Sequence, residues 1–158
     1  MQYLTNFVEA QTQLQDLRID FPAQIKSIES VNGIFVMLSM LQGLRKLKLG
    51  FSNSPAIIGS TIETLKVSLE QMKNLRKFDF ISQNCAKLKP KNIIHISQAL
   101  YSLPNIESIY LNFDSCKLGN TKIEELEEII YLLISKPQVT IVFSFCGFSE
   151  EKFQSFLL

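Results

Sequence analysis

The chain has 158 residues, of which 46% are hydrophobic and 20% are charged, and its formal net charge is +1. This much apolar material excludes an intrinsically disordered chain, and the near-zero net charge gives no general reason to expect binding to nucleic acid. The charge is uneven, however: residues 1–91 carry 12 basic and 7 acidic side chains, whereas residues 92–158 carry 4 and 8. The length suits a single domain over residues 1–158.

Three features bear on the cellular compartment. The first residues do not form a basic and then apolar signal-like segment, and no apolar run reaches the ~18 residues of a membrane-spanning helix. The chain has three cysteines, an odd number, and no Asn-x-Ser/Thr sequon. We therefore expect a cytoplasmic protein in a reducing compartment, with no membrane partner.

An eight-residue pattern with apolar residues at positions 1, 4, 6 and 8 recurs along the chain. Its copies begin at Leu14, Leu44, Leu75 and Ile106, and a weaker fifth copy begins at Val139. Measured at the fourth position, with Ile141 in that place in the last copy, successive copies lie 30, 31, 31 and 32 residues apart. Alternation with a period of two is typical of a strand with one buried face, which predicts strands near 15–21, 45–51, 76–82, 107–113 and 139–145.

Between these strands the apolar spacing changes to that of an amphipathic helix. The clearest example has apolar residues interleaved with four glutamates between Ile123 and Leu133, and Asn120 or Thr121 is expected to cap it. One strand and one helix in every ~31 residues predicts an α/β fold of right-handed βα units with a parallel sheet. Because helices are wider than strands, the sheet is expected to line the concave side and the helices the convex side.

The pattern resembles the leucine-rich repeat family, whose core motif is L-x-x-L-x-L-x-x-N/C-x-L. The helix-bearing spacing of ~31 residues is most similar to the ribonuclease-inhibitor-like subclass, and the resemblance covers the chain from about Leu14 to Phe148. It implies a horseshoe-shaped solenoid of about five repeats, either whole or a segment of a longer one. The Asn/Cys position of the motif drifts, and it falls on Asn53, Asn84, Cys116 or Cys146.

The cysteines and the only histidine are the obvious candidates for chemistry. Cys85, Cys116 and Cys146 lie 31 and 30 residues apart, but no Cys-x-x-Cys pair occurs. The resemblance implies that each thiol fills a structural position in a turn, so we expect neither a disulfide nor a metal site. His95 falls on a predicted helix without an orienting partner, and no glycine-rich phosphate loop is present. We therefore expect no enzyme activity and no cofactor.

The concave sheet face is where the leucine-rich repeat family usually binds, so the resemblance places the candidate partner-binding residues there. If positions 4, 6 and 8 face the core, positions 3, 5 and 7 face outward. The candidates on this surface are Arg18, Lys46, Lys48, Lys77, Asp79, Tyr110 and Asn112. Lys46, Lys48 and Lys77 are expected to lie side by side with Asp79 offsetting one charge, which predicts an acidic or phosphorylated protein segment as the partner. A second basic stretch, Lys87–Lys91, is interpreted as a solvated loop.

Three functions remain open at this point. The first is a non-catalytic protein–protein interaction or scaffold module that binds a partner on its concave face. The second is a structural subunit of a large multi-subunit assembly. The third is a regulator of an enzyme such as a small GTPase or a nuclease, although no arginine has a loop context that marks it as catalytic.

Overall fold

A computed structural model describes residues 13–23, 25–118, 122–144 and 146–147. Five strands alternate with four helices in this part of the chain. The strands are β1 (Asp16–Asp20), β2 (Lys46–Gly50), β3 (Lys77–Ile81), β4 (Ser108–Asn112) and β5 (Gln138–Val142). The helices are α2 (Ile28–Leu38), α3 (Gly59–Gln71), α4 (Pro90–Ser102) and α5 (Ile123–Ile134). The predicted α/β class and the alternation of strand and helix are confirmed.

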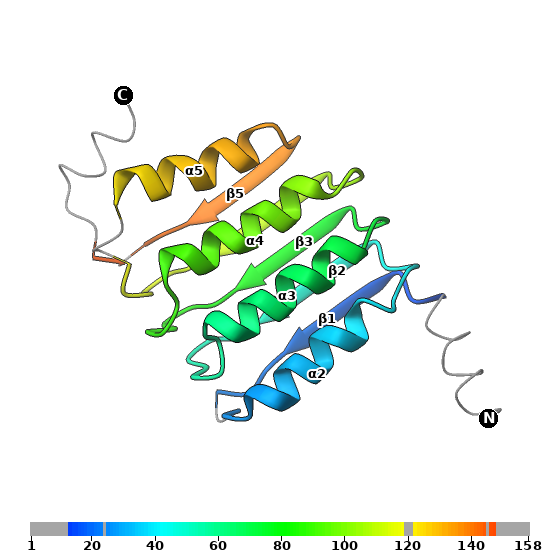
Figure 1. Ribbon diagram of the computed structural model, residues 1–158, viewed down its shortest axis with the longest axis horizontal. Helices are drawn as coiled ribbons and strands as arrows, with labels where there is room; N and C mark the ends of the chain where they lie inside the picture. The colour runs from blue at the N-terminus through cyan, green and yellow to red at the C-terminus, as the bar shows by residue number, and fades with distance from the viewer. Residues whose placement is uncertain (1–12, 24, 119–121, 145, 148–158) are drawn as a thin grey trace.

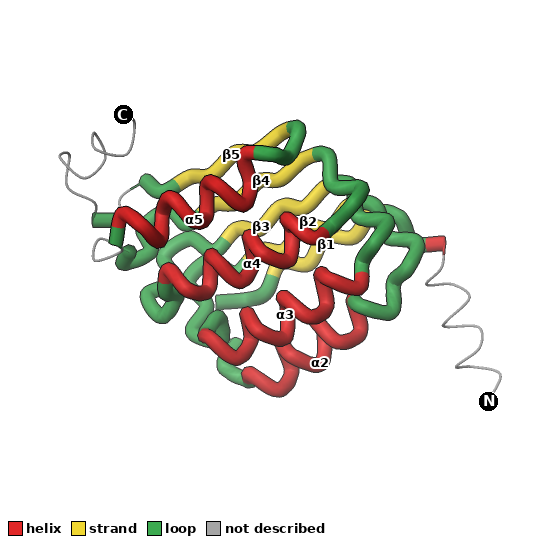
Figure 2. Tube along the Cα trace, turned by 45° about the horizontal axis from the view of Figure 1, so that its top comes forward, coloured by secondary structure: helices red, strands yellow, loops and turns green. Residues whose placement is uncertain are grey.

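All five strands form one parallel sheet in the order β1-β2-β3-β4-β5. The helices lie in one layer against one side of this sheet (Figures 1 and 2). We call that side the helix-covered face and the other side the open face. Each helix contacts the helix that follows it, from α2 to α5. None of the described helices is both long enough and apolar enough to cross a membrane.

The strand register corrects one detail of the predicted pattern. Leu17 pairs with Leu47, Leu47 with Phe78, and Phe78 with Ile109, as expected, but Ile109 pairs with Val139. The fourth position of the last copy is therefore Val139 and not Ile141, and its strand, at 138–142, starts one residue earlier and ends three residues earlier than the predicted range of 139–145. The Val139–Phe143 stretch alternates throughout, so period alone fits both registers.

The core lies between the sheet and the helices, and it contains a row of phenylalanines. Phe21 stacks on Phe51 at a ring-centroid distance of 4.2 Å, and Phe113 stacks on Phe143 at 5.6 Å. In the third unit Ser82 takes the place of an aromatic, which interrupts the row. Phe80, two residues earlier, bridges the gap, with its ring 5.7 Å from Phe51 and 6.0 Å from Phe113.

In the turns after the strands, the Asn/Cys position of the motif corresponds to two consecutive residues with different roles. The first has a positive φ angle, and the second is buried. Asn53, Asn84 and Ser115 have positive φ angles of 58°, 55° and 58°, a backbone conformation that asparagine adopts more readily than most residues. The residue that follows each of them is buried: Ser54, Cys85 and Cys116. Cys146 is buried in the last turn, whereas the preceding Phe145 lies outside the described residues.

Each thiol donates a hydrogen bond to a backbone carbonyl. Cys85 Sγ contacts the Phe51 oxygen at 2.9 Å, Cys116 Sγ the Ser82 oxygen at 2.8 Å, and Cys146 Sγ the Phe113 oxygen at 2.9 Å. Each bond joins a turn to the turn of the preceding unit. The three cysteines are free thiols in the structure. That they form neither a disulfide nor a metal site in solution stays a prediction.

Thiol reactivity tests this prediction. Burial raises the pKa of Cys85 and of Cys146 to about 11 and raises the pKa of Cys116 as well. Because the thiolate is the reactive form, the folded protein should react slowly with an aromatic disulfide reagent at pH 8, and the denatured, unreduced protein should give three thiols quickly. The unfolded state loses its thiol protons first, so the contribution of the thiols to stability should be constant below about pH 9 and decline between about pH 9 and pH 11. Fewer than three thiols after denaturation would contradict the prediction.

The start of each later helix is held by a side chain in its first turn. The backbone N–H of Ile58 donates to Thr61 Oγ1 at 2.9 Å, that of Lys89 to Asn92 Oδ1 at 2.8 Å, and that of Lys122 to Glu125 Oε2 at 2.9 Å. Lys122 is the N-cap residue of α5, so the expectation that Asn120 or Thr121 caps it was wrong. Both of those residues lie outside the described part of the chain.

Candidate binding face

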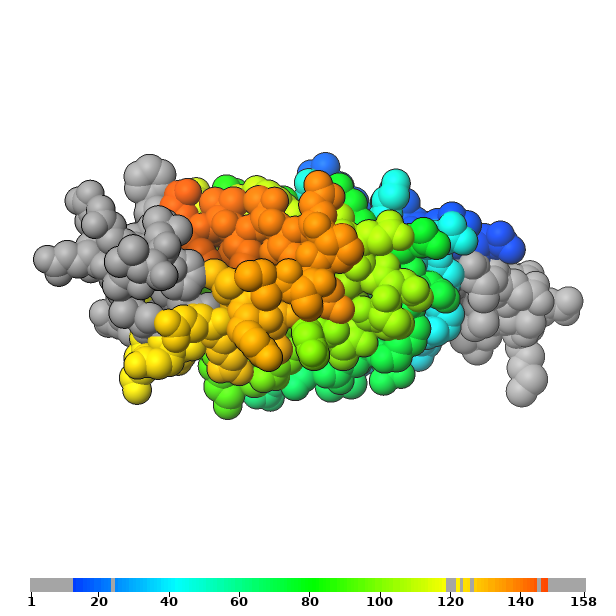
Figure 3. Space-filling model, turned by 90° about the horizontal axis from the view of Figure 1, so that it is seen from above, coloured from blue at the N-terminus to red at the C-terminus, as the bar shows by residue number. Residues whose placement is uncertain are grey.

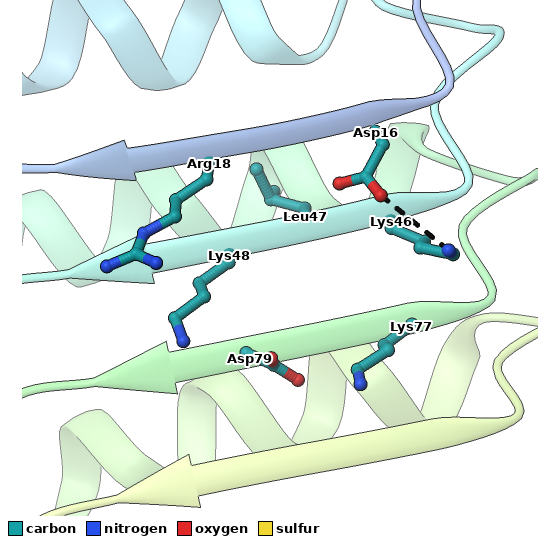
Figure 4. Close-up of a pocket in the computed structure, with 7 residues that line it drawn as sticks. All are labelled: Asp16, Arg18, Lys46, Leu47, Lys48, Lys77 and Asp79. Atoms are coloured by element: carbon teal, nitrogen blue, oxygen red, sulfur yellow. Dashed lines mark ion pairs between the residues drawn. The ribbon is translucent and has the colours of Figure 1, made fainter.

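The open face carries the side chains at the odd positions of the strands, as expected from the alternation. Lys46 pairs with Lys77, and Lys48 pairs with Asp79, so the three lysines occupy two adjacent strands. Figure 4 shows Arg18, Lys46, Lys48 and Lys77 extending along this face, whereas Leu47 comes from the alternate position. The predicted juxtaposition of the three lysines is confirmed. In the last strand the outward residues are Gln138, Thr140 and Val142, in place of the expected Thr140, Val142 and Ser144.

Two of the four cations on this face have acidic partners. Arg18 Nε lies 2.6 Å from Asp20 Oδ2, and Lys46 Nζ lies 3.6 Å from Asp16 Oδ2 (Figure 4). These side chains are more than half exposed, so each pair contributes only about 0–1 kcal/mol. Lys48 and Lys77 form no ion pair with any residue in the described part of the chain. The face therefore keeps two unneutralised ammonium groups.

Asp79 behaves differently from the expectation. It was expected to neutralise one of the lysines, but it forms no ion pair within the described residues, and the acidic partner of Lys46 is Asp16. Its Oδ1 atom is buried and has no hydrogen-bond partner. A buried carboxylate oxygen without a donor costs free energy that a ligand can recover by supplying one. Asp79 is thus an unused acceptor between cations.

A hollow of about 250 Å³ is lined by Asp16, Arg18, Lys46, Leu47, Lys48, Lys77 and Asp79. A second hollow of about 470 Å³ adjoins it at the starts of the strands and shares Asp16, Lys46 and Lys77. Arg45 and Arg76 belong to this second hollow, and Arg76 Nη1 lies 3.0 Å from Glu107 Oε1. The sequence-based list missed both arginines because they precede the strands. Arg45 and Arg76 occupy the same position in two successive copies of the pattern, and this repetition could have identified them from the sequence.

Tyr110 and Asn112 lie beside the cationic region on β4. Asn112 Nδ2 donates to the Tyr110 hydroxyl at 3.1 Å, and Asn112 Oδ1 accepts from the Asp114 N–H at 2.9 Å. Asn112 is only 8% exposed, so it positions the tyrosine and offers little surface of its own. Tyr110 is half-buried and pairs with Asp79 on β3 and Thr140 on β5, whereas Ile81 and Val142 pair with Asn112. The face therefore passes from cationic on β1–β3 to uncharged on β4 and β5.

The second basic stretch is separate from this face. Lys73, Arg76 and Lys77 lie at the start of β3, whereas Lys87–Lys91 follow its end, so the two stretches lie at opposite ends of the strand. Lys87, Lys89 and Lys91 are exposed, while Leu88 between them is fully buried. His95 lies on α4, as expected. Among the residues that the structure describes, no three His, Cys, Asp or Glu side chains group as metal ligands would.

Lys136 shows a further departure from the apolar pattern. It occupies the first position of the last copy, where earlier copies have leucine or isoleucine. Its Nζ donates to the carbonyls of Tyr101 and Leu103 at 2.8 and 3.2 Å and lies 5.4 Å from the centre of the Tyr101 ring. Partial burial lowers the pKa of this ammonium group. Lys136 is thus engaged at the end of α4 and is not available to a ligand on the open face.

Comparison of the chain with protein-family models and with curated proteins found no match in either case.

Proposed function

We propose that this chain is a leucine-rich-repeat βα solenoid that acts as a non-catalytic protein–protein interaction or scaffold module in the cytoplasm. The open face is its concave side, and the partner presents an acidic or phosphorylated segment to it. Support for the repeat class comes from the register, in which equivalent residues follow one another at intervals of 30, 31, 31 and 30. The single layer of helices and the thiol-to-carbonyl bonds between turns support it further.

One observation carries the binding proposal: Lys48 and Lys77 are unpaired ammonium groups on adjacent strands, beside Lys46. Strands in a sheet are ~4.8 Å apart, so these like charges repel one another, and the single carboxylate of Asp79 between them offsets only part of this repulsion. An anionic segment relieves this repulsion and gains attraction from Arg18 as well.

The size of the effect requires several contacts at once. A single exposed ion pair contributes about 0–1 kcal/mol, so one carboxylate against one lysine gives no useful affinity. Three or four cations in one hollow can hold a run of acidic residues or a phosphate group. Such binding should weaken as salt rises above about 0.15 M, where charges are screened over about 8 Å.

Charge reversal on the face provides the test. We expect the triple variant Lys46→Glu, Lys48→Glu, Lys77→Glu to bind a fluorescent tetraglutamate peptide, or its phosphoserine counterpart, at least about tenfold more weakly than the unmodified protein does. The physical reason is that three attractive contacts become repulsive. Fluorescence anisotropy at about 0.05 M salt, where screening is weak, measures the dissociation constant.

The matched control is the triple variant Lys87→Glu, Lys89→Glu, Lys91→Glu, which changes the net charge by the same amount away from the open face. This variant should keep most of the affinity. Equal weakening by both variants would mean that net charge, not the open face, attracts the peptide. No binding by the unmodified protein to either peptide would contradict the proposed partner chemistry.

A further inference from the structure

The outer side of α5 carries a stripe that is both acidic and apolar. Glu124, Glu127 and Glu128 are exposed, and Tyr131 and Ile134 follow them at helical spacing. Tyr131 is 75% exposed and Ile134 is 73% exposed, more than any other large hydrophobic residue in the described part of the chain. α5 contains four glutamates and no lysine or arginine. An exposed apolar pair beside a block of one charge marks an interaction surface.

The open face has the complementary pattern within the same chain. It is cationic around Lys48 and Lys77 and becomes uncharged towards Tyr110 on β4, with Ile81 as an apolar residue at the end of β3. The two patterns also match in length. Glu127 and Ile134 are separated by ~10 Å along a helix that rises 1.5 Å per residue. Lys48 on β2 and Tyr110 on β4 are separated by two strand spacings, also ~10 Å.

We propose that α5 of one copy docks across the open face of a second copy, with its glutamates against Lys48 and Lys77 and with Tyr131 and Ile134 against Tyr110 and Ile81. This inference rests on the proposed function, since it uses the same face, and it names one acidic partner for it: a second copy of this chain. The whole helix, ~18 Å long, fits within the ~19 Å spanned by five strands.

The fold dictates the kind of assembly. α5 belongs to the helix layer, on the side of the sheet opposite to the open face (Figure 2; α5 is yellow to orange in Figure 3). One copy therefore cannot use both surfaces against the same neighbour in a reciprocal contact. The contact joins the helix side of one copy to the open side of the next, so it continues head to tail into open chains or closes into a ring. A single helix buries a small area, which makes the association weak and reversible.

Sedimentation velocity over a range of protein concentrations tests this assembly. The unmodified protein should sediment faster as its concentration rises at about 0.05 M salt, without stopping at a dimer, and should stay monomeric at about 0.5 M salt. The face variant Lys46→Glu, Lys48→Glu, Lys77→Glu should be monomeric on its own. The helix variant Glu124→Lys, Glu127→Lys, Glu128→Lys should also be monomeric on its own.

Mixing the two variants is the decisive step. Each then offers a surface whose charge complements the other, so the equimolar mixture should associate again. Glu125 is left unchanged because it caps α5, and circular dichroism checks that both variants keep their helix content. A second variant that is independent of charge, Tyr131→Ser, should weaken self-association with little loss of stability, because the side chain is largely exposed.

Two results would overturn the proposal. The first is a monomeric unmodified protein at all concentrations at low salt. The second is a mixture of the two charge variants that stays monomeric while each variant is folded. Either result leaves the proposed function standing if the unmodified protein still binds the acidic peptide, so the two failures are distinguishable.

Discussion

The Phe80→Ala variant is expected to lose about 3–5 kcal/mol of unfolding free energy, which is a large part of the stability of an ordinary domain. Phe80 is fully buried and bridges the phenylalanine row where Ser82 interrupts it. Truncation leaves a cavity between Phe51 and Phe113 that no neighbouring aromatic at position 82 can fill. Urea denaturation followed by circular dichroism gives the free-energy difference.

Tyr131→Ala is the matched control, since it removes an aromatic ring that is 75% exposed. Its effect should stay within about 0.5 kcal/mol, as for most surface substitutions. A loss of unfolding free energy below about 1 kcal/mol for Phe80→Ala would mean that the packing of the phenylalanines on either side does not depend on the Phe80 ring. Ser82→Phe should not rescue the variant fully, because it also removes the hydrogen bond from the Ser82 hydroxyl to the Asn112 carbonyl.

The second large effect is expected at Cys116. Cys116→Val should lower the unfolding free energy by about 1–3 kcal/mol, because it keeps an apolar side chain but leaves the buried Ser82 carbonyl without its donor. Cys116→Ser retains a donor, and serine already occupies the equivalent buried position at Ser54. We therefore expect the serine variant to be the more stable of the two. The same thermal or urea unfolding measurement decides the order.

If Cys116→Val were as stable as the unmodified protein, the thiol would act through its packing alone. If Cys116→Ser were the less stable of the two variants, the polarity of serine in the core would outweigh the hydrogen bond that it restores. Cys85 and Cys146 provide a comparison, because the carbonyls of Phe51 and Phe113 also accept from the backbone N–H groups of Ser54 and Cys116, so the valine variants at these positions should lose less stability.

Apolar periodicity predicted the strands well because burial of alternate residues is a local property of each strand. Leu47, Leu49 and Phe51 are all buried, as their positions required. The periodicity could not set the register of β5, because Val139, Ile141 and Phe143 fit two alignments that differ by two residues. Backbone pairing with Ile109 selects one of them, and that choice depends on contacts 30 residues away.

The sequence predicted which residues lie on the candidate face, but it did not predict which of them form ion pairs with one another. Alternation places Lys46, Lys48 and Lys77 on one surface, and the structure does the same. Which carboxylate reaches which ammonium group depends on side-chain direction, so Asp16 and not Asp79 is paired with Lys46. The role of Lys136 could not be predicted from the sequence either. A lysine at a position that leucine usually occupies does not indicate that its ammonium group donates hydrogen bonds to two backbone carbonyls.

The order of the strands in the sheet determines which parts of the molecule unfold locally first. Each strand pairs only with its neighbours in the chain, and each described helix packs against the helices next to it in sequence. Stability in such an arrangement is shared between adjacent units, and among the described units the outermost contact one described neighbour whereas the middle unit contacts two. Leu17 and Ile19 in β1 and Val139 and Ile141 in β5 are only partly buried, whereas Phe78 and Phe80 in β3 are fully enclosed. Within the described strands, local unfolding therefore reaches β3 last, and a partner that spans several strands slows this fraying by tying the outer units to the centre.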